Sequence, residues 1–133
     1  IKKEFNPCKG ELIYFRGKDV ACDIAEVLRK SGYNVKELVC YRQSPILLEN
    51  STVNDIRNSL IGAVVLFSSR SAKYFSDMIG FLPDGFVVFC ISQEVANVIK
   101  KEFPKSKINY KVAKSPNLSD MYKLVVAAYQ VGD

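Results

Sequence analysis

The sequence predicts an α/β domain in which parallel strands alternate with helices. Short apolar runs recur along its 133 residues, and between them apolar residues repeat at spacings of three and four, the period of an amphipathic helix. The composition, 48% hydrophobic and 25% charged, is sufficient for a sizeable core and excludes a disordered or collagen-like chain. A chain of this length is expected to form one domain.

The first third of the chain predicts one strand–helix–strand unit. The apolar run 12–15 is a strand that ends at Arg16. Apolar residues at positions 20, 24, 27 and 28 predict a helix, for which Asp19 is a candidate N-cap and Gly32 a candidate C-terminal stop. Residues 35–41 predict the second strand.

The rest of the chain predicts three further strands, each with a helix after it, and a short helix before them. In order, they are a helix opened by Ser51 or Thr52, a strand over 63–67, a helix capped by Ser68 or Ser69, a strand over 86–91, a helix opened by Ser92, a weaker strand over 108–112 and a last helix after Pro116. The helix residues expected in the core are Val53, Ile56, Leu60, Ala72, Phe75, Ile79, Val95, Val98, Ile99, Met121, Leu124, Val125 and Ala128. The run 63–67 is apolar on both faces, which is typical of a central parallel strand.

Five strand-then-helix units in series require parallel pairing through right-handed crossovers. We therefore expect a three-layer α/β/α architecture of the flavodoxin-like kind, with one five-stranded parallel sheet in the order 2-1-3-4-5. A Rossmann order also fits the elements, but the number of units favours the first. The single domain is expected to span 1–133, with a lead-in over 1–10, a first β-α-β unit over 11–41 and the remaining β-α units over 42–133.

The charge balance narrows the classes of partner. Nineteen Lys and Arg against fourteen Asp and Glu give a net charge of +5, which suits a polyanionic partner or simply keeps the protein soluble. The sequence holds no block of five like charges and no Arg-rich stripe with aromatics, so nucleic acid is not expected. The apolar runs are far shorter than the roughly 20 residues that cross a bilayer, so no membrane span is expected.

Cysteine and histidine usage excludes several kinds of chemistry. The chain has no histidine and no Cys-x-x-Cys motif among its four cysteines, which argues against a zinc site and against Ser-His or Cys-His nucleophiles. Cys40 and Cys90 lie in apolar runs, where a thiol behaves as a small core residue. The loose spacing, which includes Cys8 and Cys22, favours reduced thiols and a cytoplasmic location.

The candidate site lies at the carboxyl ends of the predicted strands, because ligands of open α/β sheets bind there. The loops at these ends are Arg16-Gly17-Lys18, Tyr41-Arg42-Gln43, Ser68-Ser69-Arg70-Ser71, Ser92-Gln93-Glu94 and Ser115-Pro116-Asn117. Three of them place hydroxyls at helix starts, where free amides and the helix dipole favour an anion. Two alternatives stay open: serine is a common N-cap, and the basic residues can form a solvated rim.

Known anion-binding motifs are missing from these loops. The sequence has neither Gly-x-Gly-x-x-Gly nor Gly-x-x-x-x-Gly-Lys-Ser/Thr. A response-regulator receiver needs acidic residues after its first and third strands, where this chain has Arg16-Gly17 and Ser68-Ser69. A flavodoxin-type flavin site needs a hydroxyl-rich first loop, which is absent too.

Four stretches in register resemble the uroporphyrinogen-III synthase family. Residues 12–42 resemble its strand ending in Arg-Gly, helix ending near Gly and Val-rich strand followed by Tyr. Residues 63–72 resemble its Phe-Thr/Ser-Ser-Pro turn, 88–96 its Ile-Gly-x-x-Thr-Ala turn and 113–117 its Ser-Pro-Thr motif. The resemblance extends from about residue 11 to residue 130, and it covers only the second half of the family's two-domain chain.

The resemblance implies a cofactor-independent lyase of heme (tetrapyrrole) biosynthesis that needs no metal. Such enzymes close hydroxymethylbilane, which carries eight carboxylates, to uroporphyrinogen III with inversion of ring D. Tyr41 matches the family's tyrosine and is the candidate general acid, although a half-buried strand-end aromatic is the alternative. The candidate substrate-binding residues are Arg16, Gly17, Ser68, Ser69, Ser92, Gln93 and Ser115.

This chain departs from the family pattern in several places. Ser92 replaces a Gly, Val95 a Thr, Arg70 a Pro and Asn117 a Thr. Because only half of the family's length is matched, we expect a folded but poorly active fragment whose first β–α unit either docks into its own sheet or swaps with a second copy in a domain-swapped dimer. The alternatives are a non-enzymatic flavodoxin-like module that binds an anion or a partner, and another small-anion enzyme on the same scaffold.

Overall fold

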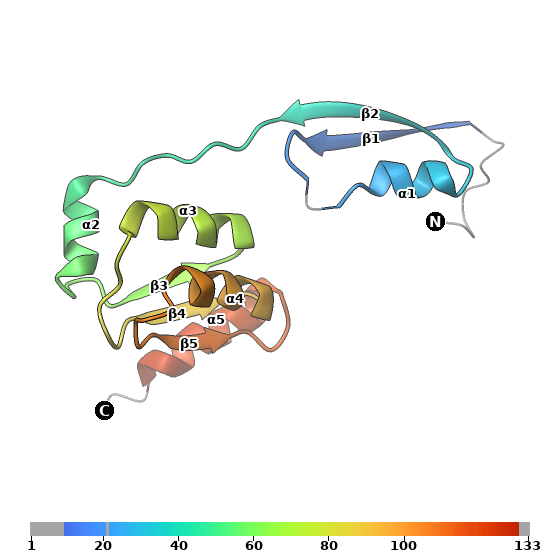
Figure 1. The fold of residues 1–133 in the computed structure, drawn as a ribbon. Helices are drawn as coiled ribbons and strands as arrows, with labels where there is room; N and C mark the ends of the chain where they lie inside the picture. Colours follow the sequence, from blue (N-terminus) through green and yellow to red (C-terminus); the bar gives the residue numbers. More distant parts are fainter. Residues whose placement is uncertain (1–9, 21, 131–133) are drawn as a thin grey trace. The chain divides into compact units, whose positions relative to one another are not determined.

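The computed structural model describes residues 10–20 and 22–130, and these form two compact units. Unit 1 is Ile1–Pro45 and unit 2 is Ile46–Asp133 (Figure 1). Residues 42–49, which form neither helix nor strand, contain the boundary and are exposed. The single domain expected over 1–133 stays a prediction, and Cys8 lies outside the described residues.

Unit 1 is one parallel β-α-β unit. Strands β1 (Glu11–Gly17) and β2 (Asn34–Tyr41) pair in parallel, and helix α1 (Ile24–Lys30) connects them. Alternate residues of β1 point to opposite faces, so Leu12 and Tyr14 pack in the small core while Ile13 and Phe15 are 54% and 64% exposed. The core is completed by Ala25, Leu28, Tyr33 and Val35.

Helix α1 begins later than the sequence suggested. Its N-cap is Asp23, whose carboxylate accepts a hydrogen bond from the Glu26 amide at 3.0 Å, so the expected cap at Asp19 is wrong. Both residues are good N-caps, so residue type alone does not choose between them. The predicted stop at Gly32 is confirmed, since this glycine has a positive φ of 88° directly after the C-cap Ser31.

Unit 2 is a three-layer α/β/α arrangement around a parallel sheet in the order β3-β4-β5. Its strands are β3 (Ala63–Leu66), β4 (Val87–Cys90) and β5 (Asn109–Val112), and its helices are α2 (Asn50–Arg57), α3 (Ser69–Ile79), α4 (Gln93–Glu102) and α5 (Leu118–Tyr129). Helices α3 and α4 cover one face of the sheet and α5 lies on the other (Figure 1). This is the arrangement that successive right-handed crossovers produce when the connection from β5 leads back over the second face.

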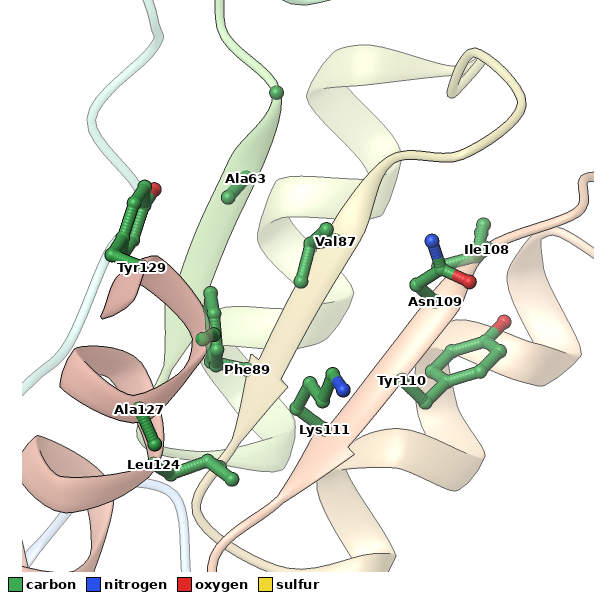
Figure 2. A pocket seen from close by; sticks show the side chains of 12 residues that line it. Ala63, Val87, Phe89, Ile108, Asn109, Tyr110, Lys111, Leu124, Ala127 and Tyr129 are labelled. Atoms are coloured by element: carbon green, nitrogen blue, oxygen red, sulfur yellow. The ribbon is translucent and has the colours of Figure 1, made fainter. Parts of the chain in front are cut away.

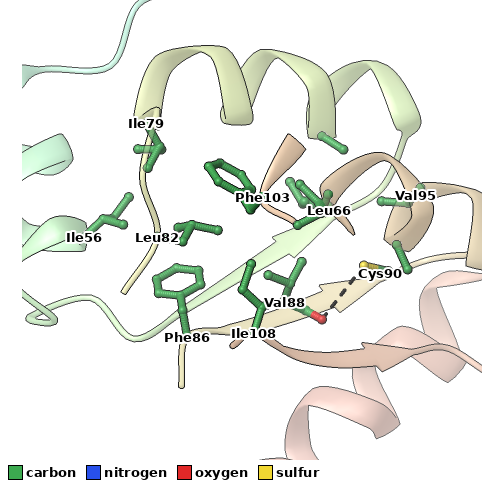
Figure 3. Close-up of a cluster of buried hydrophobic side chains, with 13 residues drawn as sticks. Ile56, Leu66, Ile79, Leu82, Phe86, Val88, Cys90, Val95, Phe103 and Ile108 are labelled. Carbon is green, nitrogen blue, oxygen red and sulfur yellow. Dashed lines mark hydrogen bonds between the residues drawn. The ribbon is translucent and has the colours of Figure 1, made fainter. Parts of the chain in front are cut away.

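The main core of unit 2 lies between the sheet and the α3–α4 layer (Figure 3). Val88 and Cys90 of β4 point into it and are fully buried, while Phe89 points to the α5 face. The predicted helix faces are largely confirmed, since Ile56, Ala72, Ile79, Val95, Ile99 and Met121 are buried. The predictions for Leu60 and Ala128 are wrong, because Leu60 lies beyond the end of α2 and is 77% exposed, and Ala128 of α5 is exposed.

The expected single five-stranded sheet is wrong. The strands form two sheets, β1-β2 and β3-β4-β5, and the β1–β3 pair that the order 2-1-3-4-5 requires is not formed. Hydrophobic periodicity predicts which residues form strands and which face is buried, but it does not say which strand edges meet. Within the described residues β3 therefore pairs with β4 alone, and Val65 at this edge is 41% exposed rather than central.

The two cysteines expected in the core, Cys40 and Cys90, differ in burial. Cys90 is buried as predicted, and burial raises the pKa of its thiol to about 11. Cys40 is exposed, because it lies in the last four residues of β2, all of which are exposed. In the part of the chain that the structure describes, no helix has the length and apolar character needed to cross a membrane.

Candidate functional site

The carboxyl end of unit 1 brings together Arg16, Gly17 and Tyr41, three of the predicted site residues. Gly17 pairs with Tyr41 in the strand register, and the Lys18 amide donates a hydrogen bond to the Tyr41 carbonyl at 2.9 Å. The phenol ring of Tyr41 lies against Gly17 and is 59% exposed, so it is neither buried nor half-buried. The Tyr41 side chain, at the end of β2 and in contact with Gly17, is therefore accessible to a ligand.

Arg16 is held by contacts inside unit 1. Its Nε donates to Glu37 Oε1 at 2.7 Å, and Arg29 Nη2 donates to the other oxygen of the same carboxylate at 2.8 Å. The hydrogen bonds from Arg29 and Arg16 keep the pKa of Glu37 below its usual value. Arg16 Nη1 also donates to the carbonyls of Gly17 and Lys18 at 3.1 and 3.0 Å. The guanidinium therefore fixes the turn after β1, and substrate contact by Arg16 stays a prediction.

The carboxyl end of unit 2 presents three capped helix starts along one sheet edge. Ser68 Oγ accepts from the Ser71 amide at 3.0 Å, Ser92 Oγ from the Val95 amide at 3.5 Å, and Asn117 Oδ1 from Asp120 at 2.8 Å. Each cap has an extended backbone, as an N-cap needs. The capping role that the sequence left open is thus confirmed for both serines.

The other predicted residues of unit 2 lie at the same edge. Ser69 is the first residue of α3, and Gln93 the first of α4, where its side-chain amide donates to Asn97 at 3.0 Å. Ser115 lies in the loop after β5, and its carbonyl accepts from the Asn117 amide. Because β3, β4 and β5 are parallel, their carboxyl ends share one edge of the sheet.

The predicted site residues thus form two groups, one in each unit. Arg16, Gly17 and Tyr41 belong to unit 1, and the serines and Gln93 belong to unit 2. Each group has the geometry that the sequence suggested, at the carboxyl ends of parallel strands. A single site made from both groups stays a prediction.

Comparison with known proteins bears on the identity of this fold. The family model described as uroporphyrinogen-III synthase HemD matches residues 2–123. The chain belongs to the uroporphyrinogen-III synthase family. It is also similar to the crystal structure of uroporphyrinogen-III synthetase from Helicobacter pylori, with a TM-score of 0.66 and 21% sequence identity over 90% of this chain.

The matched structure is longer than this chain. This synthase-family chain spans 54% of the H. pylori chain, about half its length. At 21% identity the likeness to that structure concerns the fold. A search of curated proteins found no match.

Sequence reasoning missed Glu37, the acceptor for both arginines in this synthase-family chain. Glu37 is opposite Tyr14 in the strand register, on the face that also carries Arg16. A signal was present: with β1 and β2 in register, the alternation of β2 places an acid beside the only cation of β1. No three Cys, Asp or Glu residues within the described ranges are grouped as a metal ion requires.

The sequence also missed a hollow of about 860 Å³ on the α5 face of unit 2 (Figure 2). It lies toward the amino ends of the strands, because Ala63, Val87 and Asn109, the first residues of β3, β4 and β5, line it. Phe89 and Leu124 make its apolar floor, with Lys111 beside it. The hollow therefore extends from the amino ends of the strands as far as Phe89 and Lys111, whereas the capped helix starts follow the carboxyl ends.

Proposed function

We propose that this chain is part of an enzyme that converts hydroxymethylbilane to uroporphyrinogen III. The reaction is a cofactor-independent lyase reaction in which ring D is inverted as the macrocycle closes. The observation that carries the proposal is the row of capped helix starts at one sheet edge in a chain whose family model matches residues 2–123. An octacarboxylate substrate suits such an edge, because helix N-termini favour anions.

Substrate carboxylates would bind at the starts of α3, α4 and α5. These helices have 11, 10 and 12 residues, long enough for the aligned peptide dipoles to act on a nearby anion. The Ser92 hydroxyl can donate to a carboxylate while its Oγ continues to accept from the helix amide. The Ser68 hydroxyl donates to Ser71 Oγ at 2.9 Å and would exchange this hydrogen bond for one to the substrate. The residues proposed to bind substrate are Arg16, Gly17, Ser68, Ser69, Ser92, Gln93 and Ser115.

Tyr41 is proposed as the general acid. Its phenol would give a proton to the hydroxyl of the substrate, which then leaves as water and produces a cationic azafulvene. The ring-D carbon that carries the methylene bridge to ring C attacks the azafulvene and gives a spiro intermediate. The bond from this carbon to the bridge then breaks, and the released methylene bonds to the other α-carbon of ring D, whose proton returns to the phenolate. The exposed phenol can be reached by substrate, and the chain otherwise acts by folding the substrate into the closing geometry.

An isomer-resolved assay tests this function. The protein is incubated with hydroxymethylbilane, the products are oxidised to porphyrins, and the inverted and non-inverted isomers are separated by chromatography. We expect the inverted isomer to form above the level in buffer, at a low rate because the chain spans about half of its structural relative. Formation of the non-inverted isomer alone would contradict the proposal, and tight binding without turnover would favour an anion-binding module.

A pair of tyrosine variants localises the chemistry. Tyr41→Phe removes only the phenol hydroxyl and should lower turnover by about 10²–10⁴-fold, the usual contribution of a general acid. Tyr122→Phe is the matched control, since Tyr122 lies on α5 and is 67% exposed. Full turnover in Tyr41→Phe would remove Tyr41 from the mechanism.

A further inference from the structure

The phenol ring of Tyr41 occupies space that a side chain at position 17 would fill. A Cβ built on Gly17 would lie 2.8 Å from Cε2 of Tyr41, 3.0 Å from Cζ and 3.3 Å from the phenol oxygen. Carbon atoms make favourable contact at about 3.5–4.0 Å, so the ring would have to move by about 1 Å to accept even a methyl group. Gly17 is the residue type that lets this ring lie flat on the strand end.

The position of Gly17 is itself fixed by a short series of polar contacts. Arg16 Nη1 donates to the carbonyls of Gly17 and Lys18, and Glu37 accepts from Arg16 Nε at 2.7 Å. Arg29 holds the second oxygen of Glu37 and also donates to the Val35 carbonyl at 2.8 Å.

These contacts connect the turn to both strands and to α1. The Lys18 amide donates to the Tyr41 carbonyl, so the turn also holds the backbone on which the phenol is carried. Glu37 and Arg16 have side chains that are 24% and 22% exposed, which makes them less accessible to competing water than surface ion pairs. The series starts at a helix and ends at the phenol.

We propose that Gly17, Arg16 and Glu37 are positioning residues that set the location of the Tyr41 phenol. This rests on the proposed function for its catalytic meaning, because a general acid must lie within hydrogen-bond reach of the leaving hydroxyl. A misplacement of about 1 Å can cost about 10²-fold in rate. This effect acts through the position of the phenol and is separate from any contact that Arg16 or Gly17 makes with substrate.

The positioning role differs from simple stabilisation in what it changes. If the three residues only stabilise unit 1, a folded variant keeps the Tyr41 ring where it is and keeps kcat. If they position the phenol, a folded variant moves the ring and lowers kcat more than it raises KM, since the helix starts of unit 2 still hold substrate carboxylates. The ring position and the kcat-to-KM split are therefore the two readouts.

The experiment uses the 133-residue chain with ¹³C-labelled tyrosine, in which Tyr41→Phe assigns the Tyr41 ring signal. In Gly17→Ala we expect that signal to shift and its NOE to the backbone of residue 17 to change, with a drop in kcat of about 10²-fold. Gly62→Ala is the matched control, because a Cβ there meets nothing within 4 Å. It should leave the ring signal and turnover unchanged.

Glu37→Gln covers the case in which Gly17→Ala does not fold. It keeps the shape of the side chain but removes the charge that holds both arginines, and it should shift the Tyr41 signal in a folded protein. An unmoved Tyr41 ring in either folded variant overturns the proposal, whatever the activity. A ring that moves in the variants supports the positioning even if the wild-type chain makes no uroporphyrinogen III. That second result counts against the proposed function instead, so the two failures are distinguishable.

Discussion

Replacing Ser68 separates its observed helix capping from its proposed anion binding. Ser68→Ala removes the Oγ that accepts from the Ser71 amide at 3.0 Å, and loss of such a cap costs about 1 kcal/mol, in a range of about 0.5–2. Ser92→Ala should cost less, because its capping hydrogen bond is longer at 3.5 Å. Urea unfolding followed by far-ultraviolet circular dichroism measures both values.

Ser68→Asp keeps the cap and changes the charge. Aspartate is as good an N-cap as serine, and its charge at a helix start contributes about 0.3–1 kcal/mol, so stability should equal or exceed that of the wild type. Two like charges about 4 Å apart repel by about 1 kcal/mol in water and about 4 kcal/mol near a protein surface. Binding of a substrate carboxylate at this helix start should therefore weaken by at least about fivefold.

The binding assay is a fluorescence titration with uroporphyrin III, the stable oxidised form of the product. Asn34→Asp is the control, since it adds the same charge at the exposed amino end of β2. Wild-type affinity in Ser68→Asp would refute the anion site at the start of α3. Wild-type stability in Ser68→Ala would refute the capping argument.

Three further predictions concern stability and association. The pKa of Glu37 is lowered in the folded protein, so its ion pairs contribute fully to the stability of unit 1 at pH values above the usual carboxyl pKa of 4.5. This contribution is lost as the pH falls through the lowered pKa of the folded protein. In unfolding measured as a function of pH, Glu37→Gln should therefore reduce the loss of stability in acid. Ile99→Ala, at a fully buried position in the core of unit 2, should cost about 2–5 kcal/mol in urea unfolding, and a loss below about 1 kcal/mol would contradict the packing described. Ile13 and Phe15 are exposed on one face of the β1-β2 sheet, which predicts self-association. Light scattering should show a dimer that Phe15→Lys weakens. A monomer at every concentration would exclude a swapped dimer.

Local patterns in the sequence predicted the elements well. The strands and the helices α3, α4 and α5 follow from their hydrophobic periods, and the caps Ser68 and Ser92 from residue type. These features depend on contacts within a few residues. The error at Asp19 has the same origin, because two acceptable caps, Asp19 and Asp23, lie four residues apart and residue type does not distinguish them.

Long-range features were predicted less well. The strands form two sheets, β1-β2 and β3-β4-β5, and no local sequence pattern indicates which strands pair with each other. Cys40 is exposed because the end of β2 lies outside the core of unit 1, and the apolar run that contains it does not indicate where that core ends. Glu37 and the hollow beside Phe89 likewise arise only when separate segments are brought together.

Amide chemical shifts during a titration with uroporphyrin III would show which end of the strands binds the tetrapyrrole. The largest changes are predicted at the carboxyl ends, at residues 68, 69, 92, 93 and 115, and around Tyr41. Changes centred instead on Val87 and Leu124 of the hollow, or no changes at saturating ligand, would contradict the account.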